Sequence, residues 1–187
     1  MKVRTLHLKF AAVTLLLAGL ATACGSGPSE ELLAQLKKDR QRFEEAELRF
    51  LKHYDELDIL KDNLNQQFVR GLNNRGKERL MQDSSAVKLY DRLMLEYQEN
   101  ERAYAAFLKE YHAWLSSYDL WLESLPETRY TESDVRQEWE ERKQQFQEFL
   151  KAEARLQDNV EMWETAFRKR TTDFRIRFNY GETEEPR

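Results

Sequence analysis

Three long stretches of the chain repeat apolar residues at helical spacing. They span residues 30–70, 77–125 and 131–178, and polar or charged residues occupy most of the positions between the apolar ones. A loop is expected at 71–76, which begins and ends with glycine, and Pro126 ends the second stretch. The pattern predicts three helices and places the chain in the all-α class.

The apolar residues recur every seven positions, which is typical of helices packed as a coiled coil. The first stretch carries this repeat at Leu36, Phe43, Phe50, Leu57 and Leu64. The third carries it at Trp139, Phe146, Val160, Phe167 and Phe174. Short connections force neighbouring helices to run antiparallel. We therefore expect an elongated antiparallel three-helix coiled-coil bundle over residues 30–180, which resembles spectrin-like three-helix coiled coils in outline.

Two details concern the ends of these helices. Thr131-Glu132-Ser133-Asp134 resembles a capping box, with an acid at the third helical position, and predicts the start of the third helix. Asp83-Ser84-Ser85 is the best candidate for an interruption of the second stretch, although one continuous helix is expected there.

Tyrosines recur at seven-residue spacing along the second stretch. They are Tyr90, Tyr97, Tyr104, Tyr111 and Tyr118, with Trp114 and Trp121 beside them. The rings can fill the seam between helices while their hydroxyls stay wet or hydrogen-bonded. Alternatively, they form an exposed aromatic surface that binds a partner. The exposure of this stripe distinguishes the two interpretations.

The same seven-residue frame places polar residues in the seams. Glu153 and Arg170 lie there in the third stretch, and His53 lies there in the first. A buried charge without a partner costs several kcal/mol, so we expect Glu153 and Arg170 to reach the edge or to pair across helices. His53 is expected to be a packed histidine and not a metal ligand.

The N-terminal segment has the features of a secretory signal peptide. Lys2, Arg4 and Lys9 give it a positive start, and residues 10–23 form an uncharged apolar run. The run has about 14 residues, whereas a membrane-spanning helix needs roughly 20, so a cleaved signal over residues 1–23 is preferred.

The sequence Leu20-Ala21-Thr22-Ala23-Cys24 resembles the lipobox of bacterial lipoproteins, although Leu20 lies one place earlier than usual. The resemblance implies that Cys24 carries diacylglycerol and becomes the mature N-terminus, with residues 24–29 as a tether. It also implies a cell-envelope location, at the periplasmic face of the outer membrane if the cell has one. Ala21-Thr22-Ala23 is also an A-x-A site for ordinary signal peptidase, which would leave a free Cys24. Because Cys24 is the only cysteine, it has no internal disulfide partner.

Charge bears on the class of partner. The full chain has 30 Lys and Arg, and loss of the three in the signal leaves 27 against 34 Asp and Glu, a net charge of −7. This balance argues against a nucleic-acid partner.

In the expected bundle, basic residues gather at the end far from Cys24. They form a candidate surface for an anionic partner, such as peptidoglycan carboxylates or an acidic envelope protein. They are Arg70, Arg75, Lys77, Arg79, Arg168, Lys169 and Arg170. The alternative is a solvated end with local salt bridges, and residues 181–187 are expected to be a disordered tail.

No catalytic or metal-binding motif stands out. The chain has no H-x-x-x-H pair, no cysteine cluster, no P-loop and no G-x-S-x-G, so we expect no catalytic residue, no metal and no cofactor.

Two function classes remain open. The preferred one is a non-enzymatic structural or interaction lipoprotein that acts as a spacer or adaptor. The other is a periplasmic chaperone-like or carrier protein that binds unfolded chains or lipid through the aromatic stripe. The oligomeric state stays open.

Overall fold

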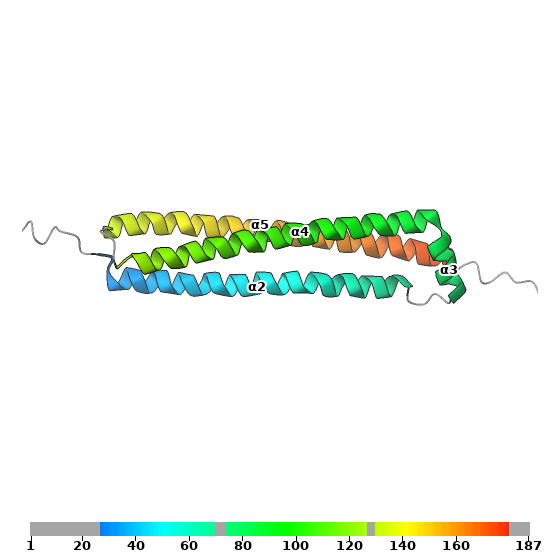
Figure 1. Ribbon diagram of the computed structural model, residues 1–187, viewed down its shortest axis with the longest axis horizontal. Helices are drawn as coiled ribbons and strands as arrows, with labels where there is room; N and C mark the ends of the chain where they lie inside the picture. Colours follow the sequence, from blue (N-terminus) through cyan, green and yellow to red (C-terminus); the bar gives the residue numbers. More distant parts are fainter. Residues whose placement is uncertain (1–26, 70–73, 127–129, 180–187) are drawn as a thin grey trace, which may run out of the picture. The chain divides into compact units, whose positions relative to one another are not determined.

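The protein is described by a computed structural model that covers residues 27–69, 74–126 and 130–179. Within this part of the chain the elements are four helices, and strands are absent. They are α2 (Glu30–Val69), α3 (Asn74–Gln82), α4 (Ser84–Ser124) and α5 (Glu132–Asn179), as Figure 1 shows. The all-α class is confirmed. Cys24, the tether up to Ser26, Arg70 and the tail 181–187 lie outside the described residues.

Side chains at the first turns cap two of the long helices. The Ser29 hydroxyl accepts a hydrogen bond from the backbone N–H of Leu32 at the start of α2 (3.3 Å). At the start of α5, the Thr131 hydroxyl accepts from the N–H of Asp134 (3.2 Å), and the Asp134 carboxylate accepts from the N–H of Thr131 (3.0 Å). This reciprocal pair is a capping box, as the sequence predicted.

The second stretch differs from the expected single helix over 77–125. It consists of α3 and α4, separated at Asp83, and α3 already begins at Asn74, inside the expected loop. The Asp83 carboxylate accepts hydrogen bonds from the N–H groups of Ser85 and Ala86, both at 2.9 Å. Such side-chain bonds compete with helix continuation and start a new helix, because they satisfy N–H groups that would otherwise bond one turn back.

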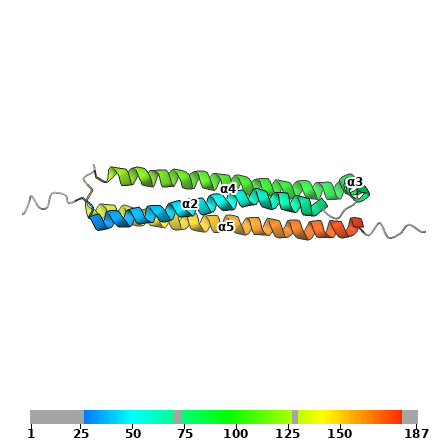
Figure 2. The same ribbon diagram turned by 90° about the horizontal axis from the view of Figure 1, so that it is seen from below.

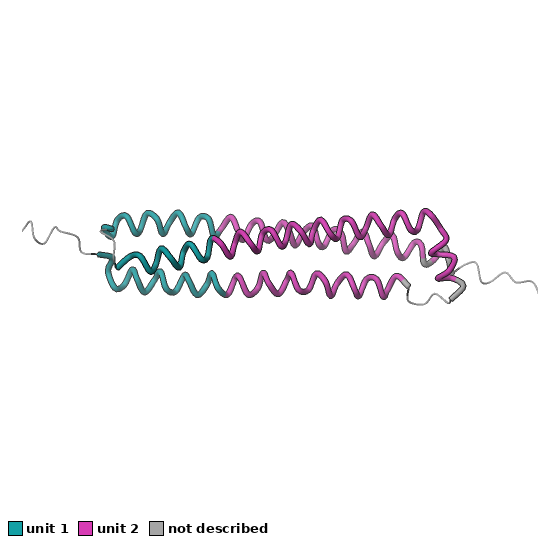
Figure 3. The backbone as a smooth tube through the Cα atoms, viewed as in Figure 1, with its two compact units in different colours: residues 1–44, 114–146 teal, residues 45–113, 147–187 magenta. Residues whose placement is uncertain are grey.

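The contacts of the chain group it into two compact units. Unit 1 contains residues 1–44 and 114–146, and unit 2 contains residues 45–113 and 147–187 (Figure 3). Helices α2, α4 and α5 each contribute a segment to both units, and α3 belongs to unit 2. Within each unit the three segments lie side by side in both views (Figures 1 and 2).

Aromatic rings fill the core of unit 1. The ring centroid of Phe43 in α2 lies 5.0 Å from Trp114, 5.2 Å from Tyr118 and 4.5 Å from Phe146. Phe43 is 1% exposed, so this cluster joins the three segments of the unit through buried apolar surface.

Unit 2 has a longer core of the same kind. Phe50 of α2 packs on Tyr111 of α4 (5.0 Å between ring centroids), and Tyr111 packs on Phe149 of α5 (5.1 Å). Further along, the Trp163 indole packs on Tyr97 (5.5 Å) and donates a hydrogen bond to the Leu93 carbonyl (2.8 Å). All five seven-residue positions predicted in the first stretch are buried, whereas in the third stretch Phe146 and Phe167 are buried and Trp139, Val160 and Phe174 are half-buried.

Candidate functional site

The tyrosine stripe lies in the core. Tyr97, Tyr104, Tyr111 and Tyr118 are each less than 5% exposed, and Tyr90 is half-buried. Of the two tryptophans beside them, Trp121 is buried, and the half-buried Trp114 donates to Gln145 (2.8 Å). This placement supports the packing interpretation, and the exposed aromatic surface is not found along these residues.

Several of the buried tyrosine hydroxyls have identified acceptors. The Tyr118 hydroxyl donates to the Leu36 carbonyl (3.0 Å), and the Tyr97 hydroxyl donates to the Asp58 carboxylate. Burial raises the pKa of Tyr97 and Tyr118 well above the ordinary value of tyrosine, because the phenolate would lose its hydration. These tyrosines therefore stay neutral and act as hydrogen-bond donors inside the packing.

The basic residues that the sequence suggests as a surface for an anionic partner belong to unit 2, as far as the structure describes them. Lys77, Arg79, Arg168 and Lys169 are exposed, and Arg170 is half-buried. The Arg168 guanidinium already has two partners, because it lies 2.6 Å from Glu164 on the same helix and donates a hydrogen bond to Gln67 of α2 (2.8 Å). Arg75 belongs to α3, but its side chain, like Arg70, lies outside the described part.

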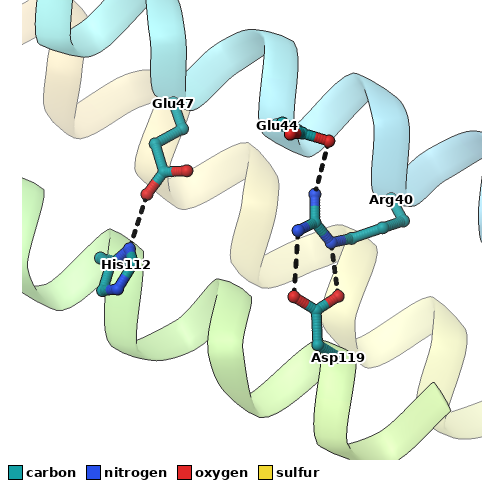
Figure 4. A network of polar contacts seen from close by, with 5 residues as sticks. All are labelled: Arg40, Glu44, Glu47, His112 and Asp119. Carbon is teal, nitrogen blue, oxygen red and sulfur yellow. Dashed lines mark hydrogen bonds and ion pairs between the residues drawn. The ribbon is translucent and has the colours of Figure 1, made fainter. Parts of the chain in front are cut away.

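Figure 4 shows two of the charged contacts between α2 and α4. In unit 1 the Arg40 guanidinium binds the Asp119 carboxylate through Nε and Nη2, the latter at 3.0 Å, and it also reaches Glu44 (3.2 Å). In unit 2 the His112 Nδ1 lies 2.8 Å from Glu47. A two-pronged arginine–carboxylate contact has directional geometry, so the Arg40 contact adds specificity to the pairing of these helices.

The most unusual site in the chain is a buried polar cluster in unit 2. Glu153 of α5 is 8% exposed, and its Oε1 atom lies 2.6 Å from Nδ1 of His53 in α2. The Tyr104 hydroxyl of α4 donates to the same oxygen (3.1 Å) and accepts from Nε2 of Gln157 (2.9 Å). Burial raises the pKa of Tyr104 above its ordinary range. Of the two expectations for Glu153, reaching the edge or pairing across helices, the structure shows the second.

An open groove of about 410 Å³ lies beside this cluster, between α2 and α5. Its lining residues are His53, Glu56, Leu57, Ile59, Leu60, Asn63, Gln157, Val160, Glu161 and Glu164. Sequence reasoning singled out His53 and Glu153 as polar residues in the seams, but it missed Gln157 and the groove. The signal that could have found the cluster was the presence of polar residues at seam positions of two different helices.

A second, smaller pocket of about 310 Å³ is mostly apolar. Its lining residues are Asn65, Phe68, Leu80, Met81, Ala86, Val87, Tyr90 and Asp91, which come from α2, α3 and α4. The rings of Phe68 and Tyr90 stack with an interplanar angle of 10°, and the Tyr90 hydroxyl donates to Asn65 (3.1 Å). Met81 is 73% exposed at this pocket.

No group of three or more His, Cys, Asp or Glu residues in the described part of the chain is placed to hold a metal ion. None of the described helices combines the length and apolar character that crossing a membrane requires. Comparison of the chain with protein-family models, curated proteins and solved structures finds no match.

Proposed function

We propose that this protein is a lipid-anchored protein of the bacterial cell envelope, and that its helical part is a non-enzymatic interaction or spacer module. The observation that carries the proposal is the N-terminal segment, in which a basic start and an apolar run lead to small residues before Cys24, the only cysteine. The diacylglycerol on Cys24 would hold the helices at a membrane surface, the periplasmic face of the outer membrane in a cell that has one.

The architecture we propose for the helical part is an elongated antiparallel three-helix coiled coil. Contacts inside unit 2 support it. Along α2 of unit 2, Phe50, Asp58 and Asn65 contact Tyr111, Tyr97 and Tyr90 of α4, so residue numbers rise on one helix and fall on the other. Residue numbers rise in the same direction along α2 and α5, because His53 contacts Glu153 and Gln67 contacts Arg168. This is the order of an up-down-up arrangement.

The ring contacts of the aromatic side chains support a packing role for the tyrosine stripe. Its rings hold the helices together inside both units, as Phe43 with Tyr118 and Phe50 with Tyr111 illustrate. A partner would then bind to grooves and charged faces of the helices. The candidate partners are an envelope protein and peptidoglycan.

The test is intact mass and membrane fractionation of the native protein and of the Cys24→Ala variant, combined with crosslinking in cells. We expect a diacylated, membrane-bound native protein and a variant that leaves the membrane fraction, and the crosslinked partner then identifies the process. A native protein that is soluble and has a free thiol would contradict the anchor, and turnover of a substrate would contradict the non-enzymatic role.

One observation favours the carrier function as a second candidate. The apolar pocket formed by Phe68, Leu80, Met81 and Tyr90 is of the size at which small-ligand sites begin, roughly 300 Å³. A fluorescent fatty acid whose binding to the native protein is abolished by Ala86→Phe, which fills the pocket, would support it. Binding that is unchanged by this substitution would count against it.

A further inference from the structure

The groove beside the buried cluster in unit 2 combines an apolar floor with an acidic edge. Leu57, Leu60 and Val160 contribute apolar surface, and Ile59 is 61% exposed. The carboxylates of Glu56, Glu161 and Glu164 line the same groove. No lysine or arginine is among the lining residues of this described site.

The hydrogen-bond chain beneath the groove determines which polar atoms remain available. As a carboxylate, Glu153 can only accept, so both Nδ1 of His53 and the Tyr104 hydroxyl must donate to it. The Tyr104 oxygen, having used its proton, accepts from the Gln157 amide nitrogen. Of the two groove-lining members, Gln157 therefore keeps Oε1 as an acceptor and its second Nε2–H as a donor, and Nε2 of His53 is an acceptor when the ring is neutral.

The acidic side chains of the groove are only partly neutralised by neighbours. Lys52 lies 3.5 Å from Glu56, and Arg168 lies 2.6 Å from Glu164, each pair within one helix. No ion pair within the described residues involves Glu161. The groove thus presents a net negative charge over an apolar floor, which favours a ligand that has a positive charge and an aliphatic portion.

We propose that this groove binds a lysine or arginine side chain presented by a basic, leucine-rich segment of a partner protein. The methylene stem would pack on Leu60 and Val160, and the cationic group would meet Glu161. The exposed Ile59 provides a contact for an apolar neighbour of the base, which favours a polypeptide over a small polyamine. The inference rests on the proposed function, because it names the partner chemistry of an interaction module.

The experiment follows the histidine ring resonances of the full native chain by NMR during titration with two synthetic peptides. One peptide alternates leucine with lysine, and its control replaces each lysine by glutamine. We expect the lysine peptide to shift the His53 ring resonance saturably and the glutamine peptide to leave it in place. His112, whose side chain is 73% exposed in the same unit, is the internal control and should not move.

A matched pair of variants makes the test specific to the groove. Glu161→Gln removes a lining carboxylate and should weaken binding of the lysine peptide roughly two- to fivefold, the range of an exposed ion pair. Glu148→Gln is the control on the same helix, because Glu148 pairs with Lys151 (2.8 Å) and does not line the groove. It should leave binding unchanged, and circular dichroism should show equal helicity for both variants.

The inference would be overturned by equal shifts of His53 and His112, by equal binding of the two peptides, or by equal weakening by the two variants. A third peptide, which alternates leucine with glutamate, tests the opposite charge. Its preferential binding would also overturn the inference and would assign the surface to an acidic partner. Because peptide binding is measured with purified protein, its failure is distinguishable from failure of the membrane anchor, which only the Cys24→Ala fractionation reports.

Discussion

The hydroxyl groups of buried tyrosines form specific hydrogen bonds inside the core. Tyr118 reaches a backbone carbonyl, whereas Tyr104 connects Glu153 to Gln157. A buried polar group costs little when it is hydrogen-bonded and much more when its partner is removed. Individual hydroxyls are therefore expected to matter for stability out of proportion to their size.

Tyr104→Phe tests this point. The ring is retained, but Glu153 loses a donor and the Gln157 amide loses its acceptor. We expect the free energy of unfolding to fall by about 1–2 kcal/mol, measured by urea denaturation. Tyr130→Phe is the matched control, because Tyr130 is exposed, and it should leave stability unchanged. Equal stability of the two variants would show that the hydroxyl of Tyr104 contributes nothing.

The buried tyrosines also predict unfolding at alkaline pH. The pKa values of Tyr97, Tyr104 and Tyr118 are raised in the folded protein, with burial as the largest cause. The folded state therefore holds these protons more tightly than the unfolded state does. This contribution to stability is fully present below the unfolded pKa of about 10 and is lost as the pH rises above it.

Absorbance of tyrosinate and circular dichroism, recorded together during a pH titration, check this prediction. We expect part of the tyrosine absorbance change to appear only as helicity is lost above pH of about 10. Complete titration of all tyrosines while helicity stays constant would contradict the burial of the stripe.

At the scale of elements, the junction between α3 and α4 depends on one side chain. Asp83 accepts from the N–H groups of Ser85 and Ala86, while its own carbonyl accepts from Val87 and its N–H donates to Arg79. One residue therefore ends one helix and begins the next. The apolar pattern did not predict this break between two helices, because the pattern continues on both sides of Asp83.

Asp83→Ala should remove the cap of α4 and lower the free energy of unfolding by about 1 kcal/mol, because two backbone N–H groups lose their acceptor. Asp83→Asn keeps an oxygen acceptor at the same place and should retain most of the stability. Thermal unfolding of the two variants and the native protein measures the difference. Equal losses for alanine and asparagine would mean that the charge, and not the cap, is what matters.

At the scale of the whole molecule, the two compact units share their three long helices. The helix α2 passes from unit 1 to unit 2 after Glu44, α4 passes between them at Trp114, and α5 after Phe146. Neither unit has a long helix of its own. We therefore expect the chain to unfold as one cooperative system.

Phe43→Ala tests cooperativity. Phe43 is buried among rings of unit 1, and its truncation should lower the free energy of unfolding by about 3–5 kcal/mol. Native-state hydrogen exchange should then show reduced protection of the most protected amides in unit 2 as well, for example around Leu93. A loss of protection confined to residues 30–44, 114–124 and 132–146 would show that the units unfold independently.

The sequence alone was sufficient for the helical class, for most helix ends and for many of the side chains that the helices bury, but not for the break at Asp83. Apolar periodicity is a local property, so it predicted the long helices to within a residue or two at most ends, and it placed Phe43, Phe50 and Phe167 in the seams, where they are buried. The capping box at Thr131 is equally local. The proposed anchor at Cys24 rests on sequence alone.

The tertiary structure decided which polar residues meet. A seven-residue repeat looks the same after a shift of one heptad, so the pattern leaves the register between helices open. His53 and Glu153 are 100 residues apart, and their contact exists only in one register. The same register brings Gln157 to Tyr104 and opens the groove at Glu161, because hydrogen bonds and charge pairs depend on distances of a few ångströms that periodicity cannot specify.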